Sequence, residues 1–509
     1  MRRTRTACGL LLSGLLAVLG CDTTQTALLP DVVPSPALTA APAPVPQGAP
    51  PTPAPAPEDR PLAITLPAAL QLADVRALDV AAAGERVRAA AAALEGAEVL
   101  WLPTITIGGD YNRHDGRNQD TTGRVFDNSR NSGMLGVGTG IGPAAILDVG
   151  QAIFAPLNAR QQVRARQADL QAASNDTLVA VSDAYFNVQQ ARGELASAVE
   201  TTRRTEDLLA RTRKLAPAIV PDLEVFRAET ELARRQEAEL LARERWQVAS
   251  AELIRVLRLD PSAQVEPVEP PQLRVDLIDL NKPLDELIPI GLTNRPELAS
   301  RQAQVQATLA LLRQERLRPL IPSVLLRGYS TPVTGTLGAG LFGGGENSSF
   351  GDGGLRSDWD LQVLWQLNNL GFGNHALVRQ REAENRQAVL DLFRTQDRIA
   401  AEVAQTYAQA RQSARRVEVA ERAVRSAVLS ADKNLTALSQ SKAVGNQLVT
   451  LVRPQEVVAS IQSLAQAYAD YYGAVADANR AQFRLYRALG QPAQCLAREG
   501  ALPGADANP

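Results

Sequence analysis

The sequence predicts a mainly α-helical fold that also contains membrane β-strands, with a helix–strand–strand–helix–helix unit present twice. Three observations lead to this fold class. An apolar heptad seam runs through residues 389–438 over about seven heptads, which is typical of coiled-coil packing. Four short segments alternate apolar residues with glycine or polar residues, as the strands of a membrane barrel do. The order of these elements recurs after about 220 residues, which indicates an internal duplication.

A targeting segment opens the chain. A basic start is followed by a short apolar run at residues 10–19 and by Val18-Leu19-Gly20-Cys21, which resembles the bacterial lipoprotein cleavage box. We expect residues 1–20 to be a signal peptide and Cys21 to be lipidated, the alternative being an ordinary secretory signal with an incidental cysteine. Residues 21–61 would then be the lipid anchor and a Pro/Ala-rich, semi-rigid linker.

The first repeat is predicted to span residues 62–260. It begins with a helix from Thr65 or Pro67 to about Leu100, because proline suits the first turn of a helix. Two strands follow, and the polar residues 112–132 between them are expected to form an exposed loop. A long helix from about Asn158 to Ala216 and a returning helix from Asp222 to about Leu259 complete the repeat.

The second repeat is predicted to span residues 284–492, after a Pro-rich connection at 261–283. Its first helix runs from Leu284 to about Leu320, and its strands occupy residues 323–330 and 357–369. The long helix with the heptad seam comes next, then a turn at residues 444–446, and then a returning helix from about Gln447 to Leu489. Residues 493–509 are expected to be a disordered tail.

The long helix of the second repeat cannot fold back into a compact domain. No Gly or Pro interrupts it between Asn374 and Val444, and roughly 70 residues at 1.5 Å each give a rod on the order of 100 Å long. Such a rod needs partner helices along its whole length. Only Gln396 and Glu421 break the apolar seam, and in a ring of helices around a wet lumen these two residues can face water.

Composition excludes several classes of function. A formal net charge of −2 provides no basic field for nucleic acid. Two histidines and three cysteines make a structural zinc site or a disulfide framework improbable. Beyond the N-terminus no run of about 20 apolar residues could form a transmembrane helix. No catalytic constellation stands out, so we expect no enzyme, no cofactor and no metal.

The strands need copies of the same chain. Bacterial membrane barrels contain at least eight strands, whereas one chain supplies four. An open sheet in lipid would leave unpaired backbone groups at its edges, at a cost of several kcal/mol each. Three copies would supply twelve strands. A ring of strands continuous with a ring of helices completes both kinds of element under cyclic symmetry.

The chain resembles the TolC-like outer membrane efflux proteins over roughly residues 62–492. The motifs that carry the resemblance are Asn294-Arg295-Pro296-Glu297-Leu298, the prolines Pro103 and Pro322 before the strands, Ala184-Tyr185-Phe186, Leu257-Arg258-Leu259 and Ala488-Leu489-Gly490. The resemblance implies a homotrimer with a 12-stranded outer-membrane β-barrel joined to a periplasmic α-helical barrel. It also implies a periplasmic adaptor and an inner-membrane pump as partners. The chain departs from the family at its tips, where Pro221 replaces the common glycine and no acidic residue lies between Gly445 and Pro454.

Two groups of residues are the candidate sites. The helix-hairpin tips are expected to dock the adaptor, the alternative being simple turns. These tip residues are Ile219, Val220, Pro221, Asp222, Val444, Gly445, Asn446 and Gln447. The second group is expected to face lipid on the barrel. Its members are Ile105, Ile107, Tyr111, Leu135, Val137, Ile141, Trp359, Leu361, Val363 and Trp365.

The sequence therefore favours a passive exit duct of a tripartite efflux or type I secretion system. The duct would sit in the cell outer membrane, with its helical part in the periplasm. The alternative is a lipid-anchored periplasmic coiled-coil spacer or adaptor without a pore. The alternating strands distinguish the two hypotheses, because a spacer has no need of lipid-facing strands.

Overall fold

The computed structural model describes residues 61–106, 109–119, 122–135, 144–216, 219–331, 356–444 and 447–492. The chain divides into two units, Met1–Glu58 and Asp59–Pro509, and all described residues lie in the second. The predictions for the signal peptide, for Cys21 and for the tail at 493–509 therefore fall outside the described residues.

The first half of the described chain is built from ten elements. They are β1 (Leu62–Ile64), α2 (Leu66–Arg76), α3 (Leu78–Glu98), η1 (Val99–Trp101), β2 (Thr104–Thr106), β3 (Gly109–Gln119), β4 (Val125–Leu135), β5 (Ala144–Asp148), α4 (Val149–Leu215) and α5 (Asp222–Leu257). The connection between the repeats contains the short strand β6 (Val265–Pro267).

The second half shares the order of helices and sheet strands with the first, and among the described residues it has a turn before its long helix and a strand pair at its tip that the first half lacks. Its elements are α6 (Leu284–Asn294), α7 (Pro296–Leu317), β7 (Ser323–Thr331), β8 (Arg356–Leu364), η2 (Asn368–Gly371), α8 (Phe372–Ala437), β9 (Ser441–Val444), β10 (Gln447–Thr450) and α9 (Pro454–Ala488). The predicted mainly α fold with long helices is confirmed, since α4 has 67 residues and α8 has 66.

Several boundaries differ from the prediction. The strand expected at 357–369 is β8, which ends at Leu364. Each predicted first helix is two helices, because the backbone is extended at Ala77 (ψ 123°) and at Arg295 (ψ 122°). At Arg295 the cause is the following proline, which disfavours helical dihedrals in the residue before it. Helix α4 begins at Val149 rather than near Asn158, because the Asp148 side chain caps it by accepting a hydrogen bond from the Gln151 N–H at 3.0 Å.

The polar stretch at 112–132 is not a loop. Strands β3 and β4 pair antiparallel from Gly109 opposite Leu135 to Gln119 opposite Val125, which makes a β-hairpin. A separate four-stranded sheet has the order β2-β5-β7-β8 with antiparallel neighbours throughout. Within the described residues, β2 and β8 are its two end strands.

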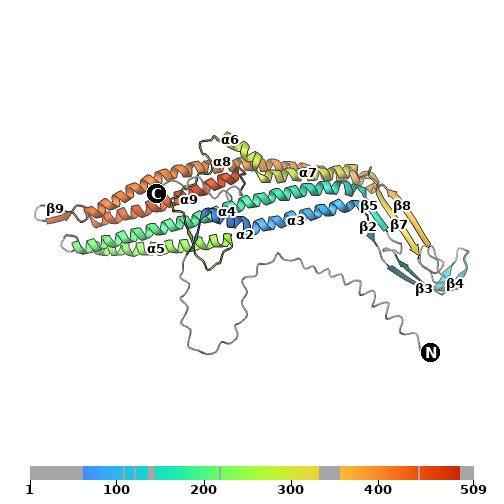
Figure 1. Ribbon diagram of the computed structural model, residues 1–509, viewed down its shortest axis with the longest axis horizontal. Helices are drawn as coiled ribbons and strands as arrows, with labels where there is room; N and C mark the ends of the chain where they lie inside the picture. The colour runs from blue at the N-terminus through green and yellow to red at the C-terminus, as the bar shows by residue number, and fades with distance from the viewer. Residues whose placement is uncertain are drawn as a thin grey trace, which may run out of the picture. The chain divides into compact units, whose positions relative to one another are not determined.

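The long helices α4 and α8 pass through two different packing environments (Figure 1). Near the four-stranded sheet, α4 packs between α3 and α7, and α7 packs against α8. Farther from the sheet, α4 pairs with α5 and α8 pairs with α9, while α4 also contacts α9. No helix in the described ranges combines the length and apolar character needed to cross a bilayer.

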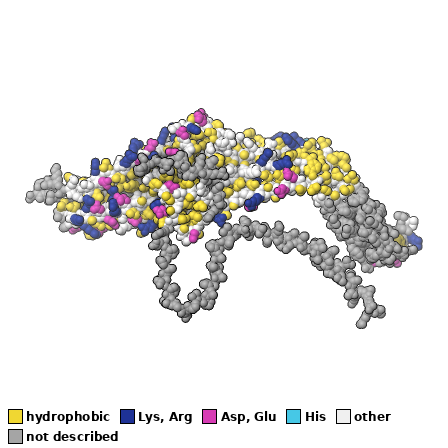
Figure 2. Space-filling model, viewed as in Figure 1, with side chains coloured by type: hydrophobic (Ala, Val, Ile, Leu, Met, Phe, Trp, Pro, Cys, Tyr) yellow, Lys and Arg dark blue, Asp and Glu magenta, His cyan; other side chains and the backbone are white. Residues whose placement is uncertain are grey.

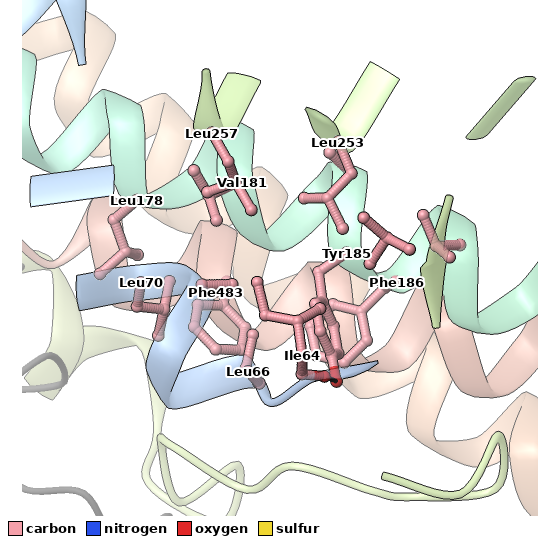
Figure 3. Close-up of a cluster of buried hydrophobic side chains, with 14 of the residues drawn as sticks. Ile64, Leu66, Leu70, Leu178, Val181, Tyr185, Phe186, Leu253, Leu257 and Phe483 are labelled. Carbon is pink, nitrogen blue, oxygen red and sulfur yellow. Dashed lines mark hydrogen bonds between the residues drawn. The ribbon is translucent and has the colours of Figure 1, made fainter. Parts of the chain in front are cut away.

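The first core lies where α2, α4, α5 and α9 meet the parallel pair β1 and β6 (Figure 3). Tyr185 and Phe186 of α4 are fully buried there, and Phe186 also contacts the ring of Phe483 from α9. The Tyr185 hydroxyl donates a hydrogen bond to the carboxylate of Glu269 in the connection. Burial and this hydrogen bond raise the pKa of Tyr185 far above its usual range, so the phenol stays protonated.

The second core repeats this arrangement with Tyr407 of α8. The hydroxyl of Tyr407 hydrogen-bonds to the carbonyl oxygens of Leu280 and Lys282, at 3.3 and 3.0 Å. Tyr185 therefore holds the first part of the inter-repeat connection, and Tyr407 holds its end. Buried amides of α9 hold the middle of the connection, since the backbone N–H of Val275 donates to Asn479 Oδ1 at 2.9 Å and that of Ile278 donates to Gln482 Oε1 at 3.1 Å. The Pro-rich segment is thus fastened across the helices.

Two of the motifs that suggested a family meet at a buried ion cluster. Arg295 is 4% exposed and bonds to Glu297 at 2.8 Å, to Glu402 at 3.0 Å and to the carbonyl oxygen of Ala488 at 3.3 Å. Arg487 of α9 contacts the same two carboxylates and also Asp176 of α4, at 2.6 Å. The cluster therefore joins α4, α7, α8 and α9.

Gly490 ends α9 against the same cluster, and its replacement by alanine is expected to destabilise the protein. Its φ of 72° lies in the left-handed region, and an added Cβ would come within 2.7 Å of the backbone nitrogen of Arg295. The left-handed penalty and the overlap together predict a loss of about 2–4 kcal/mol. Chemical denaturation of the detergent-purified protein measures it. Gly84→Ala is the control, because Gly84 lies inside α3 with no atom within 4 Å of a new Cβ and should gain up to about 1 kcal/mol. Equal shifts in the two variants would contradict this prediction.

Candidate functional site

The first candidate site is the tip that joins α4 to α5. The N–H groups of Ile219 and Val220 donate to the carbonyl oxygen of Leu215 at 2.9 and 3.2 Å, which closes the end of α4. Pro221 is the residue that precedes α5, and Asp222 begins that helix. Val220 is buried, Ile219 is half-buried, and Pro221 and Asp222 are exposed. Of the four predicted docking residues, only the last two present most of their side-chain surface to a partner.

The second tip differs from the predicted helical turn. Strands β9 and β10 pair antiparallel, with Val444 opposite Gln447, and α9 begins only at Pro454. The returning helix therefore does not start at Gln447. β-branched residues in β10, Val449 and Thr450, favour extended backbone, and Pro454 holds Arg453 extended. Gly445 and Asn446 lie outside the described residues.

Polar side chains join the two hairpins near these tips. Arg204 of α4 bonds to Asp432 of α8 and to Glu200 of its own helix, at 2.5 and 2.8 Å. Arg211 reaches the carbonyl oxygen of Leu435 at 3.2 Å and the Ser439 hydroxyl at 3.0 Å. Burial alone would lower the pKa of Arg204, but its hydrogen bonds and charge pairing with Asp432 and Glu200 outweigh burial and raise it. The guanidinium therefore stays charged.

Two exposed apolar residues beside the first tip were missed by the sequence analysis. Leu223 and Phe226 lie in the first two turns of α5 and are 57% and 64% exposed. The sequence did contain a signal for them, because two large apolar residues directly after the start of a helix are candidates for contact with a partner protein. Together with Pro221 and Asp222 they form an exposed surface, which we call the α5 tip surface.

The second candidate site is one face of the four-stranded sheet. The register pairs Leu361 with Leu326 and Leu326 with Ala145, and it pairs Val363 with Val324. Directly opposed residues of antiparallel strands share a face, so these apolar side chains form one surface, on which Leu326, Leu361 and Val363 are exposed. The opposite face is mixed, with Gln362 beside Leu325.

The remaining residues of the lipid-facing prediction are described to different extents. Ile105 pairs with Ala145 and Trp359 with Gly328 in the four-stranded sheet. Tyr111 and Leu135 belong to the β3–β4 hairpin, opposite Gly133 and Gly109. Trp365 follows β8 with an exposed side chain. The residues outside the described ranges are Ile107, Val137 and Ile141.

Residues 69–257 match the family described as "Outer membrane efflux protein". No curated protein sequence matches the chain.

Solved outer membrane channels share its fold. The outer-membrane channel OprN is 18% identical with a TM-score of 0.65, and the likeness covers 84% of this chain and 90% of OprN. A membrane protein from Pseudomonas aeruginosa is 19% identical with a TM-score of 0.66, over 84% of this chain and 92% of that protein. The outer membrane protein VceC from Vibrio cholerae is 15% identical with a TM-score of 0.64, over 84% of this chain and 96% of VceC.

These findings agree with the order of helices and strands and with the long helices. The family match falls on the first repeat, whereas the fold shared with the solved structures covers most of the chain. The first repeat is therefore similar to the family described as outer membrane efflux protein, and the chain has the fold of solved outer membrane channels.

Proposed function

We propose that three copies of this chain close their sheets into one 12-stranded barrel in the outer membrane, continuous with a periplasmic tunnel of long helices. The observation that carries this proposal is the open four-stranded sheet. Its end strands β2 and β8 have one neighbour each among the described residues. In lipid, each unpaired backbone group would cost several kcal/mol, and a closed barrel removes that cost.

The helices give the assembly a second support. Helix α5 packs on α4 with one side, while Leu240, Leu241 and Val248 remain exposed on it. A groove beside two of them is lined by Leu241, Val248 and Ala184. A neighbouring copy in a ring would cover this apolar surface, as cyclic assemblies bury the same two patches at every interface.

The channel conducts substrates passively from a periplasmic adaptor and an inner-membrane pump to the outside, in a tripartite efflux or type I secretion system. Docking at the periplasmic end uses the α5 tip surface and the paired strands β9 and β10. The exposed apolar side chains of Leu223 and Phe226 support this assignment, because such residues serve as anchors in protein interfaces. Cys21 carries the lipid anchor, and residues 21–61 link it to the folded body.

Single-channel conductance in planar bilayers tests this function. The purified protein is expected to insert and conduct, whereas Leu361→Arg is expected to insert poorly because a lipid-facing arginine costs about 2–4 kcal/mol at the bilayer midplane. Gln362→Arg is the matched control, since the adjacent residue lies on the opposite face of the sheet and insertion should persist. A folded trimer without conductance would overturn the channel assignment. Equal insertion of both variants would contradict the assigned faces.

A further inference from the structure

The turn between β8 and α8 displays a run of large apolar side chains. Within residues 365–372, which we call the β8–α8 turn, Leu370 is 92% exposed and Phe372 is 80% exposed. Trp365 and Leu367 are also exposed. Isolated surface leucines are ordinary, but four such side chains in eight residues indicate a contact surface.

The backbone of this turn has an unusual conformation that is fixed by a hydrogen bond to a buried side chain. Asn369, Leu370 and Gly371 all have positive φ, at 51°, 58° and 93°. A leucine in the left-handed region is strained, so the surrounding structure must hold it there. The backbone N–H of Asn368 donates to Oδ1 of Asn374 at 2.7 Å, and Asn374 is buried in the first turn of α8.

The first repeat has no such turn at the equivalent place. Strand β5 ends at Asp148 and helix α4 begins at Val149, the next residue. In the second repeat seven residues separate the end of β8 at Leu364 from the start of α8 at Phe372. The turn is therefore not required for passing from a strand into a long helix.

The apolar run continues the exposed face of the sheet. Leu361 and Val363 share that face, and Trp365 and Leu367 follow at the same alternation of two residues. Figure 2 shows hydrophobic side chains gathered where the helices meet the strands, while charged side chains are spread over the rest of the helices.

Helix α8 continues the apolar run with an aromatic residue and then with polar residues. Phe372, His375 and Arg379 are exposed at spacings of three and four, so they lie along one side of this helix. A change from apolar to aromatic to cationic residues is the order in which side chains cross from acyl chains to lipid headgroups.

We propose that the β8–α8 turn is a lipid-binding surface whose residues Leu370 and Phe372 insert into the periplasmic leaflet at the boundary between headgroups and acyl chains. The proposal rests on the proposed function, because it needs the sheet to lie in the outer membrane. It commits to lipid as the occupant, since the run continues the lipid face of the sheet. A second copy of the chain is the competing occupant, because β8 is an end strand.

Depth-dependent fluorescence quenching tests the proposal on the full chain with Cys495 replaced by serine, because Cys8 leaves with the proposed signal peptide and the proposed lipid occupies the sulfur of Cys21. An environment-sensitive dye is attached at Leu370→Cys, at Leu361→Cys on the sheet face, or at the exposed position Arg398→Cys on α8. Each protein is reconstituted in phosphatidylethanolamine–phosphatidylglycerol vesicles that carry a nitroxide near the headgroup or deep in the acyl chain. We expect quenching at 370 to be severalfold stronger with the headgroup-proximal nitroxide than with the deep one, quenching at 361, and none at 398.

The other outcomes separate this inference from the proposed function. Quenching at 361 without quenching at 370 overturns the lipid surface and leaves the channel intact. A blue-shifted but unquenched dye at 370 assigns the turn to a neighbouring copy and also overturns it. Absence of quenching at both 361 and 370 overturns the membrane sheet together with the turn.

Discussion

Replacing Arg295 with alanine is expected to lower the free energy of unfolding by about 3–5 kcal/mol, as removal of one partner from a buried ion pair does. The guanidinium is 4% exposed and sits between Glu297 and Glu402. Alanine would leave two carboxylates with only Arg487 to balance them, and it would leave the carbonyl oxygen of Ala488 without this donor. The loss should be large because the cluster joins four helices.

Chemical denaturation of the detergent-purified protein measures this effect. Two further variants show whether it arises from the buried ion cluster. Arg398→Ala removes an exposed arginine from α8, the helix that carries Glu402 of the cluster, and should change stability by no more than about 0.5 kcal/mol. Arg295→Lys keeps the charge but loses the planar fork that reaches both carboxylates, so its loss should fall between the other two. Similar losses in Arg295→Ala and Arg398→Ala would refute the role of the cluster.

The same cluster sets the direction of a pH effect. Burial alone would raise the pKa of Glu297, but the hydrogen bond and charge of Arg295, with Arg487 beside it, hold that pKa below its usual range. A carboxyl whose pKa is lowered by folding stabilises the protein above its unfolded pKa, and the contribution is lost as pH falls through the folded value. The Arg295→Ala variant should therefore lose less stability than the unaltered protein on acidification over that range.

The long helices and the repeat were predictable because their signals accumulate over many residues. The seam of α8 specifies a coiled-coil partner at every turn, and Val403, Tyr407, Ala410 and Val417 are indeed buried. Its polar break Glu421 has charged partners within the chain. The carboxylate pairs with Arg425 of α8 and with Arg274 of the connection, which no pattern within one helix could reveal.

The missed elements are those that lack an apolar pattern. The β3–β4 hairpin is polar along much of its length, so its sequence shows no alternation of apolar and polar residues. Only the backbone pairing defines these strands. The break at Ala77 has no proline beside it, although Pro296 marked its counterpart at Arg295. For the candidate site, turn chemistry located the first tip but not the paired strands β9 and β10 at the second. The exposure of Leu223 and Phe226 depends on which side of α5 meets α4.

Replacing Phe186 with alanine is expected to cost about 3–5 kcal/mol, the usual range for a large aromatic side chain in a core. Phe186 has no exposed surface, and its ring meets Tyr185 edge-on at 5.8 Å between centroids and Phe483 at 5.6 Å. The residue belongs to α4, whereas Phe483 belongs to α9, so the cavity would loosen the contact between the two hairpins (Figure 3).

Phe226→Ala is the matched control for this substitution, because it removes the same side chain from the α5 tip surface, where 64% of it is exposed. Stability should change by no more than about 0.5 kcal/mol, as for other exposed positions. Binding of a periplasmic adaptor should weaken at least severalfold if Phe226 is an interface anchor. Denaturation midpoints and adaptor binding by surface plasmon resonance separate the two effects. A large stability loss in Phe226→Ala would place that residue in the core, and unchanged adaptor binding would remove it from the docking surface.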